Sequence, residues 1–351
     1  MRKILNPEDV SKLKKMIKES KRIVLTCHVH PDGDAIGSTL GWWHLLKSLG
    51  KEAAVVVPDQ LPKSLRFLPG AGEIAVYTRH DPYCTRLVEE SDLILCCDFN
   101  TASRQDHLAP LIQGSSAKKV LIDHHEGPDM NVDVMFSFPK MSSTCELVFR
   151  IIAALGYYSD MNKESATCIL CGLITDTQNF TVNCPDPEIY EVMMKLLEKG
   201  ADKTKIIEEC VKACSYDSLR LKSFALSERM EVFPKHRAII TWLSKEDLDR
   251  FHYEKGDTEG LVNMPLNIRG IVYSIFLRED ADQIKISARS KYDFPVSSIC
   301  ADLFGGGGHI QAAGGEYKGA LQECLKILKD SLGKYDKLLP SHIERIDWRN
   351  D

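Results

Sequence analysis

The sequence predicts an α/β protein whose N-terminal part forms a mainly parallel sheet covered by helices, followed by a smaller α/β domain. Short apolar runs alternate with helical patterns in the first half, and a second set of apolar runs begins near residue 231. With 351 residues, the chain also exceeds the usual size of a single core. We therefore expect a first domain at residues 1–187, a helical linker at 188–225 and a second domain at 226–345.

The elements of the first domain follow from apolar periodicity and from its glycine and proline residues. An amphipathic helix is expected at 9–20, a strand at 22–27, and a helix at 35–49 that Gly50 ends as a C-cap. Further strands are expected at 52–57, 92–97 and 119–122, and further helices at 143–155 and 163–175. Strands that alternate with helices indicate a parallel sheet with both faces covered.

The C-terminal half begins with a change in pattern. Beyond Pro185 and Pro187 the chain is charged and helical, over 188–200 and 203–213, without an obvious sheet partner, and this region is the expected linker. Strands are then expected near 231 and at 237–242, 270–277 and 283–288, before a glycine run at 305–308.

Composition excludes several classes of protein. No stretch approaches the ~20 apolar residues of a membrane span, and the N-terminus lacks the apolar core of a signal peptide, so we expect a cytoplasmic protein without membrane contact. The twelve cysteines are scattered, and we interpret them as reduced core residues; this includes the Cys168–Cys171 pair, which lies in a helical pattern without a second pair. The net charge of −5 disfavours a broad grip on long duplex nucleic acid.

The most informative segment is residues 119–126, where an apolar run ends in Asp123, His124 and His125. Strand ends of an α/β sheet deliver side chains to a cleft, so these three could reach a metal. The triplet alone is a weak signal, because Asp and His are common at strand ends.

Three other acidic segments end apolar runs in the same way. In the first, a turn shaped by Pro31 and Gly33 lets Asp32 and Asp34 converge while His28 projects from the strand end. An Asp-Gly-Asp alone is often only a solvated turn, and the remaining ligands of a calcium loop are absent. The other two segments end in Asp98 and Asp176.

Four carboxylates and two imidazoles would repel one another or shift each other's titration, so a divalent metal is their natural complement. Oxygen and imidazole donors without cysteine suit manganese better than structural zinc. The donors suffice for two ions that share one carboxylate, which favours hydrolysis of a phosphoester or phosphoanhydride. The alternative is that these acids merely cap helices and line turns.

The glycine run offers a second kind of site. Glycines let backbone N–H groups approach an anion, His309 can add a donor, and Ser287, Arg289 and Ser290 form a plausible phosphate clamp. Arg104, shortly after Asp98, is a weaker candidate for binding a phosphate. The alternatives are a flexible loop and ordinary surface arginines.

Taken together, the motifs resemble those of the DHH phosphoesterases, in the branch that carries a DHHA1 C-terminal domain. The resemblance covers nearly the whole chain and rests on these motifs: His28 to Ser38, Asp98, Asp123 to His125, Ser142 to Leu147, Thr175 to Thr177, and Gly306 to His309 with Ala313 and Gly314. No single motif is specific, whereas the set is.

The resemblance implies roles for individual residues. His28, Asp32 and Asp98 would hold one metal, and Asp34, Asp98, His124 and Asp176 the second, with Asp98 as the bridge. His125 would face the substrate phosphate, Asp123 would orient an imidazole, and a metal-activated hydroxide would be the nucleophile. The implied substrate-binding residues are Arg104, Ser287, Arg289, Ser290, Gly306, Gly307, Gly308 and His309.

The function implied is a manganese-dependent phosphodiesterase that hydrolyses very short single-stranded oligonucleotides to mononucleotides, with 3′-phosphoadenosine 5′-phosphate as a second candidate substrate. Magnesium and cobalt share the same ligands. Gln178 and the 184–186 segment depart from the small oligoribonucleases of the family, which leaves the exact substrate open. The alternatives are a cyclic or linear dinucleotide phosphodiesterase, a RecJ-like single-strand exonuclease, and an inactive nucleotide-binding module. The oligomeric state also stays open, with a homodimer among the candidates.

Overall fold

A computed structural model of the chain describes residues 2–182, 184 and 186–341. The chain divides into two compact units, Met1–Ala213 and Cys214–Asp351, and each is described by itself. Residue 185, and residues 342–345 at the end of the expected second domain, lie outside the described residues.

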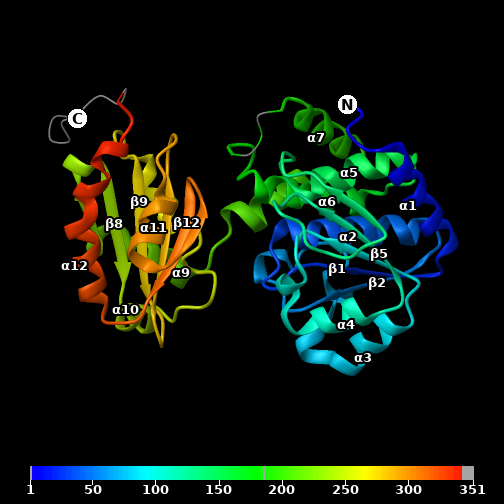
Figure 1. Ribbon diagram of the computed structural model, residues 1–351, viewed down its shortest axis with the longest axis horizontal. Helices are drawn as coiled ribbons and strands as arrows, with labels where there is room; N and C mark the ends of the chain where they lie inside the picture. Colours follow the sequence, from blue (N-terminus) through cyan, green and yellow to red (C-terminus); the bar gives the residue numbers. More distant parts are fainter. Residues whose placement is uncertain (1, 183, 185, 342–351) are drawn as a thin grey trace. The chain divides into compact units, whose positions relative to one another are not determined.

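The first unit contains a six-stranded parallel sheet, which confirms the predicted fold class (Figure 1). The strand order is β3-β2-β1-β4-β5-β6. The bounds are β1 Arg22–Thr26, β2 Glu52–Val57, β3 Ala75–Val76, β4 Leu93–Cys97, β5 Lys118–Asp123 and β6 Val134–Ser137. The edge strands β3 and β6 were not predicted, because both are too short for a clear apolar pattern.

Helices cover both faces of this sheet (Figure 1). Alternate strand residues point to opposite faces, so Ile23 and Leu25 face one core and Val24 faces the other. The first core is closed by α1 Pro7–Glu19, α2 Gly33–Ser48, α5 Thr144–Leu155 and α6 Lys163–Asp176. The second is closed by α3 Tyr77–Glu89, η3 Ala102–Leu108 and α4 Ala109–Gly114.

Glycines let α2 and α6 approach each other closely. A Cβ at Gly37 would lie 2.5 Å from the carbonyl oxygen of Cys168, and one at Gly172 would lie 2.7 Å from Asp34 Oδ1 and closer still to Cys145 Sγ. The start of α2 meets the end of α6, since a Cβ at Gly33 would collide with Thr175. This packing brings Asp34 beside Asp176.

The region expected as a linker divides between the two units. Helix α7 Glu188–Glu198 packs on α5 and α6, and α8 Lys203–Ile206 continues into a π-helical turn, η4 Ile207–Lys212, that also contacts α6. Helix α9 Tyr216–Glu228 packs on strands of the second unit. The division between the units therefore falls just after η4.

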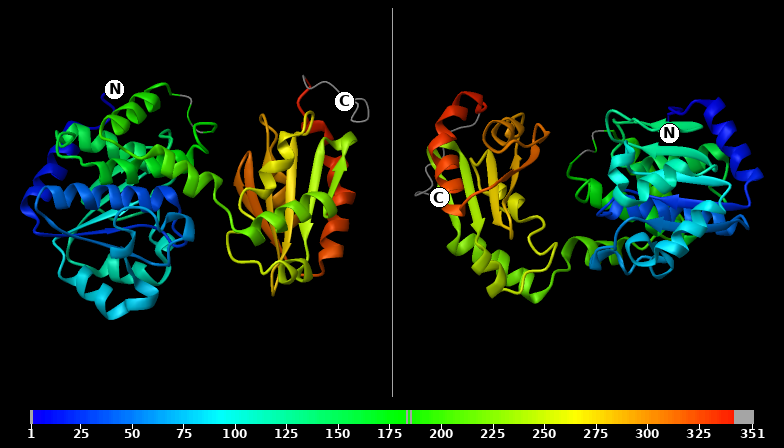
Figure 2. Two further views of the ribbon diagram at one scale, coloured as in Figure 1. Left: turned by 180° about the vertical axis from the view of Figure 1, so that it is seen from behind. Right: turned by 60° about the horizontal axis from the view of Figure 1, so that its bottom comes forward.

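The second unit is built on a mixed six-stranded sheet of order β11-β12-β10-β9-β8-β7, in which only β8 and β9 pair in parallel. The bounds are β7 Met230–Phe233, β8 Ala238–Leu243, β9 Tyr273–Glu279, β10 Ile284–Ser290, β11 Gly307–His309 and β12 Ala312–Tyr317. Helices α11 Val296–Phe304 and α12 Leu321–Ser331 pack on one face, whereas α9 and α10 Lys245–Arg250 pack on the other (Figure 2).

Short 3₁₀ turns connect these elements. In the first unit they are η1 Lys63–Leu65 and η2 Ala71–Glu73; in the second they are η5 Pro234–His236, η6 Leu261–Asn267 and η7 Leu332–Leu338.

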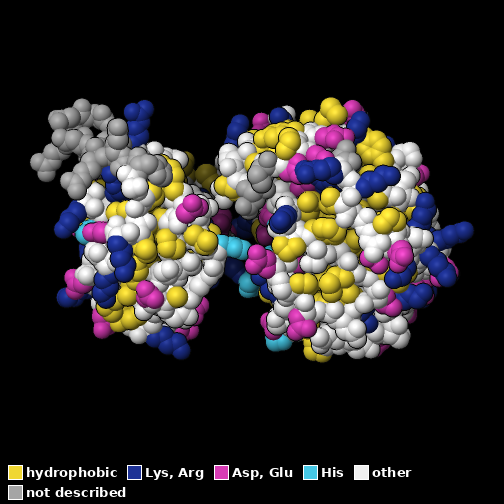
Figure 3. All heavy atoms as spheres, turned by 45° about the horizontal axis from the view of Figure 1, so that its top comes forward, with side chains coloured by type: hydrophobic (Ala, Val, Ile, Leu, Met, Phe, Trp, Pro, Cys, Tyr) yellow, Lys and Arg dark blue, Asp and Glu magenta, His cyan; other side chains and the backbone are white. Residues whose placement is uncertain are grey.

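The surface carries charges of both signs. On the face drawn in Figure 3, Lys and Arg side chains lie scattered among Asp and Glu and do not gather in one broad basic patch. Among the residues described, no helix has the length and apolar character needed to cross a membrane.

Candidate metal centre

The candidate site lies where the strand order of the first sheet reverses. Strands β2 and β3 lie on one side of the β1–β4 pair, and β5 and β6 lie on the other. In open parallel sheets this reversal opens a crevice at the carboxyl ends of the strands. His28 follows β1, Asp98 follows β4, and His124 follows β5, so three of the predicted ligands lie at the same edge of the sheet.

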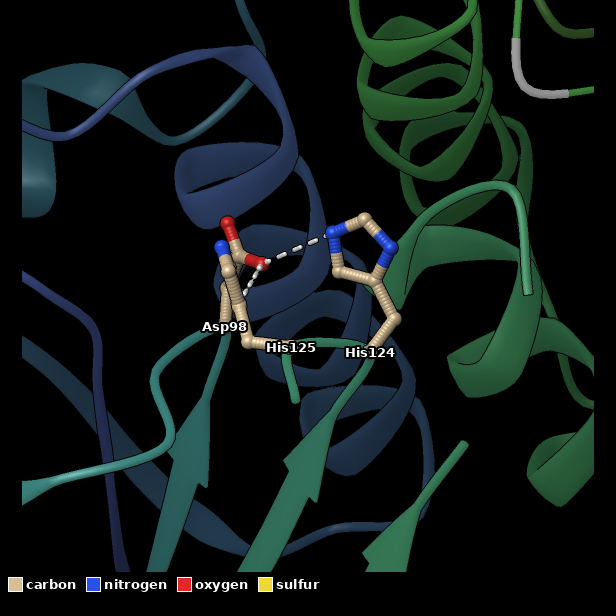
Figure 4. A group of neighbouring side chains, drawn as sticks. All are labelled: Asp98, His124 and His125. Atoms are coloured by element: carbon tan, nitrogen blue, oxygen red, sulfur yellow. Dashed lines mark ion pairs between the residues drawn. The ribbon is translucent and has the colours of Figure 1, made fainter. Parts of the chain in front are cut away.

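Asp98 occupies the middle of the site. It is buried and has a left-handed backbone with φ of 66°, a strained conformation for a residue with a side chain. Its Oδ2 lies 3.5 Å from His28 Nε2. Its Oδ1 lies 3.8 Å from His124 Nε2 and 3.9 Å from His125 Nδ1 (Figure 4). The two oxygens of one carboxylate therefore face two different sets of donors.

The predicted metal ligands all come together. Three overlapping groups of side chains have donor atoms within 4.8 Å of one another: His28, Asp32 and Asp98; Asp34, His124 and Asp176; and Asp98, His124 and His125. Within the second group, His124 Nε2 lies 3.3 Å from Asp176 Oδ2 and 3.9 Å from Asp34 Oδ2.

Hydrogen bonds orient the three imidazoles. Carbonyl oxygens accept from Nδ1 of His28, at 2.7 Å to Val29, and from Nδ1 of His124, at 3.2 Å to Met141. A carbonyl can only accept, so each Nδ1 carries a proton and each Nε2 faces the acids. His125 differs, because its Nδ1 is 2.7 Å from the buried carboxylate of Asp123.

The carboxylates crowd one another electrostatically. Burial raises the pKa of Asp34 well above its ordinary value, and the neighbouring Asp98 and Asp176 raise it further. Burial, with the charge of Asp98, also raises the pKa of Asp176 to about 8. Burial opposes ionisation of Asp98 too, but the hydrogen bond from His28 and the nearby imidazoles outweigh it and hold its pKa well below the usual range. This excess of negative charge is what a bound divalent cation would relieve.

The N-terminus of α5 supports the site, a feature that sequence reasoning missed. The backbone N–H groups of Thr144 and Cys145 donate to the two oxygens of Asp34, at 2.6 and 2.8 Å. The Thr144 hydroxyl donates to Asp98 Oδ1 at 2.9 Å. The start of a helix thus holds two of the acids in place. The Ser142–Leu147 motif could have shown this, because its Ser143 is the N-cap of α5.

A buried ion pair fixes the start of α5 in turn. Glu146 accepts from the backbone N–H and the hydroxyl of Ser142, at 3.1 and 2.6 Å, while its other oxygen accepts from Arg150. Arg150 also donates to Glu188 of α7 at 2.8 Å. The polar groups of this network satisfy one another, as buried charges require.

The hydrogen bond to Asp123 raises the pKa of His125. Arg104 lies close enough to His125 for its positive charge to lower that pKa, but this effect is the smaller one. Arg104 belongs to η3, whose backbone is tied to the crevice because Val29 N–H donates to the Arg104 carbonyl at 2.7 Å. It is therefore the predicted arginine that the structure places with the acids.

The other predicted substrate-binding residues lie in the second unit, and most of them line an open cavity of about 770 Å³. Its lining includes Ser287, Arg289, Gly306, Gly307 and His309. Ser287 and Arg289 point the same way from β10, whereas the hydroxyl of the next residue, Ser290, donates to the Phe294 carbonyl at 2.6 Å. Neither Ser290 nor Gly308 is among the lining residues.

The glycine run forms an edge strand where the sequence suggested an anion-binding loop. Residues Gly307–His309 are β11, which pairs antiparallel with β12. A Cβ at Gly308 would lie 2.5 Å from the Ala312 carbonyl oxygen, and one at Gly306 would collide with Gly314. Close strand pairing therefore requires glycine at these two positions. β11 is an edge strand in the order of this sheet, so the N–H groups on its outer side pair with no further strand of the sheet.

The fold and this cluster of acids and imidazoles define a class of protein, metal-dependent hydrolases with a parallel α/β sheet. The N-terminal domain model of the DHH family matches residues 22–173, and the DHHA1 domain model matches residues 238–334. The chain belongs to the DHH family of phosphoesterases and is a metal-dependent hydrolase.

Individual relatives agree with this assignment. The chain is 31% identical to the bifunctional oligoribonuclease and PAP phosphatase NrnA of Thermus thermophilus, over 88% of this chain and 90% of that protein. An exopolyphosphatase-related protein from Bacteroides fragilis has a crystal structure that matches with a TM-score of 0.92 and 41% identity, over 96% of this chain and 99% of that one. RecJ from Thermus thermophilus, crystallised with Mn²⁺, shares the fold with a TM-score of 0.57 and 14% identity, over 97% of this chain and 56% of that one.

Proposed function

We propose that the site holds two divalent ions, with manganese as the preferred metal. His28, Asp32 and Asp98 would bind one ion, and Asp34, Asp98, His124 and Asp176 the other. The observation that carries this proposal is the position of Asp98, whose two oxygens face different groups of donors. A donor set of carboxylates and imidazoles without thiolates fits manganese, magnesium or cobalt. Two such ions supply Lewis-acid activation of a phosphoryl group and of the attacking water.

The side chains around the ions would bind the substrate phosphate. Because Asp123 accepts from Nδ1 and favours the protonated imidazole, His125 has Nε2 free to donate a hydrogen bond to a phosphoryl oxygen. Arg104 adds a second positive charge beside it. Asp123 would act only through His125, by holding the ring and stabilising its charge.

We propose short oligonucleotides as substrates, cleaved to mononucleotides, with 3′-phosphoadenosine 5′-phosphate as a second substrate. The support is the 31% identity to an oligoribonuclease and PAP phosphatase across both domains. A further support is the cavity of the second unit, where Arg289, Ser287 and His309 offer donors to a substrate phosphate. In this proposal Gly306 and Gly308 shape the cavity by close strand pairing, and Ser290 shapes the adjoining turn.

The test is a comparison of substrates at equal concentration with manganese. The panel holds a dinucleotide, a five-mer, a long single strand, 3′-phosphoadenosine 5′-phosphate, a cyclic dinucleotide, pyrophosphate and polyphosphate. We expect kcat/KM to be highest for the dinucleotide or five-mer. A preference for the long strand, the cyclic dinucleotide, pyrophosphate or polyphosphate would overturn the proposal.

The cavity of the second unit needs a separate test. Arg289→Ala should raise KM for short oligonucleotides while kcat changes little, because the guanidinium would bind substrate without touching the reacting atoms. Arg269→Ala, an exposed arginine outside the cavity lining, is the matched control. An unchanged KM in Arg289→Ala would remove this residue from the substrate site.

A further inference from the structure

Two cysteines from separate segments of the first unit lie side by side. Cys171 belongs to α6 and Cys210 to the π-helical turn η4, and their sulfur atoms are 3.6 Å apart. Both are free thiols, and Cys210 also donates to the Ser64 carbonyl at 3.5 Å. The sulfurs of a disulfide are about 2.05 Å apart, so bond formation would shorten this separation by roughly 1.6 Å.

The two thiols differ in exposure and in acidity. Cys171 is buried, whereas Cys210 is partly exposed. The hydrogen bond between them lowers the pKa of Cys210 and raises the pKa of Cys171 well above its ordinary value. An accessible thiol with a lowered pKa beside a second thiol is the arrangement of a reversible oxidation site. Burial raises the pKa of the neighbouring thiols Cys145 and Cys168.

We propose that Cys171 and Cys210 form a reversible disulfide when the protein meets hydrogen peroxide. The Cys210 thiolate attacks one peroxide oxygen, the O–O bond breaks, and Cys210 sulfenic acid forms with release of hydroxide. The Cys171 thiol then attacks the oxidised sulfur as its proton leaves with the hydroxyl group as water. The two thiols are thereby oxidised by two electrons, and the peroxide is reduced to two equivalents of water once the hydroxide is protonated.

The position of this bond connects it to the active site. Cys171 precedes Gly172, which packs against Asp34 and Cys145, and the same helix ends at Asp176. On the other side, η4 ends one residue before the last residue of the first unit. A π-helical turn is a rare and often functional irregularity. The disulfide would pin this turn to the helix that carries a candidate ligand, and so lower turnover.

The bond itself can be tested without any assumption about the substrate. Metal-free protein is treated with hydrogen peroxide, the peroxide is removed, and unreduced peptides are mapped by mass spectrometry. We expect one linked pair that contains Cys171 and Cys210, lighter by two hydrogens and separated again by dithiothreitol. Cys214→Ser, which removes an exposed thiol, should leave this pair unchanged. Absence of the linked pair, or linkage of Cys210 to Cys214 in its place, would overturn the proposal.

The effect of the disulfide on turnover rests on the proposed function only because it requires phosphodiesterase activity. Turnover is measured with a chromogenic phosphodiester after manganese is added back to the protein. The turnover rate of the disulfide-linked protein should be lower by roughly fivefold or more, which is the range of typical coupling between two sites in a protein. Dithiothreitol should restore the rate. Cys171→Ser and Cys210→Ser should each lose the peroxide effect. Linkage without a change of rate would overturn the regulatory role alone, whereas inactivity of the unoxidised protein on all substrates would contradict the proposed function alone.

Discussion

The contact between α2 and α6 can be tested by adding one methyl group at Gly172. In Gly172→Ala, the new Cβ would lie 2.7 Å from Asp34 Oδ1 and 2.9 Å from Asp34 Cα, well inside ordinary contact distance. The Asp34 backbone belongs to α2 and cannot rotate away, so the helices must separate. Extra methyl groups in a packed core cost about 1–3 kcal/mol.

The free energy of unfolding of the first unit should therefore fall by about 1–3 kcal/mol, which in a domain of this size lowers Tm by roughly 2–12 °C. Manganese affinity should fall as well, because the displaced carboxylate is a candidate ligand. Thermal unfolding of the metal-free protein and calorimetric titration with manganese measure the two effects.

Gly114→Ala is the matched control, because nothing lies within 4 Å of a Cβ at this position and Gly114 is the last residue of α4. It should leave Tm unchanged or raise it slightly, since alanine has the higher helix propensity. If Gly172→Ala unfolds at the same temperature as the control and binds manganese as tightly, the packing does not position Asp34.

Three further predictions concern the acids and imidazoles directly. Asp98→Asn should reduce turnover by more than roughly 100-fold, because about 100-fold is the upper loss for groups that merely support a metal ligand. The unfolding temperature shows whether the variant still folds, and full activity would contradict a carboxylate shared by two ions. His124→Ala should lower the manganese content measured by metal analysis, whereas His125→Ala should keep its metal and lower kcat, and equal metal loss in both would contradict the separate roles. Because the pKa of Asp176 in the metal-free protein is about 8, its carboxyl is protonated below that pH and must lose the proton to bind a cation. Loss of this proton should raise manganese affinity by up to about tenfold per pH unit between pH 6 and 8, in addition to the effect of deprotonating Asp34, and the slope should be smaller in Asp176→Asn; a flat profile would refute this.

Much of the first unit could be predicted because its signals are local. Strands β1, β2, β4 and β5 are apolar runs bounded by polar residues, and the candidate ligands lie at or near the ends of strands or helices. Parallel strands end at one edge of a sheet, so residues distant in sequence, such as His28 and His124, could be expected to meet. Two edge strands escaped prediction, because β3 has two residues and β6 has four.

The surroundings of the cysteines could be predicted only in part from the sequence. Their scattered positions predict reduced core residues. All twelve are free, but Cys184 and Cys210 are only partly buried and Cys214 is exposed. Nothing in the spacing of Cys171 and Cys210 could show that a π-helical turn returns to α6 and brings their sulfurs together.

The sequence by itself determined the α/β class, the family motifs and the candidate metal ligands, since apolar periodicity and residue chemistry are properties of short segments. Only the tertiary structure decided how those groups are held. It assigned the Thr144 and Cys145 N–H groups to Asp34, made the glycine run an edge strand, and directed the Ser290 hydroxyl to Phe294. These outcomes depend on strand register, helix packing and side-chain direction, which contacts between distant residues set.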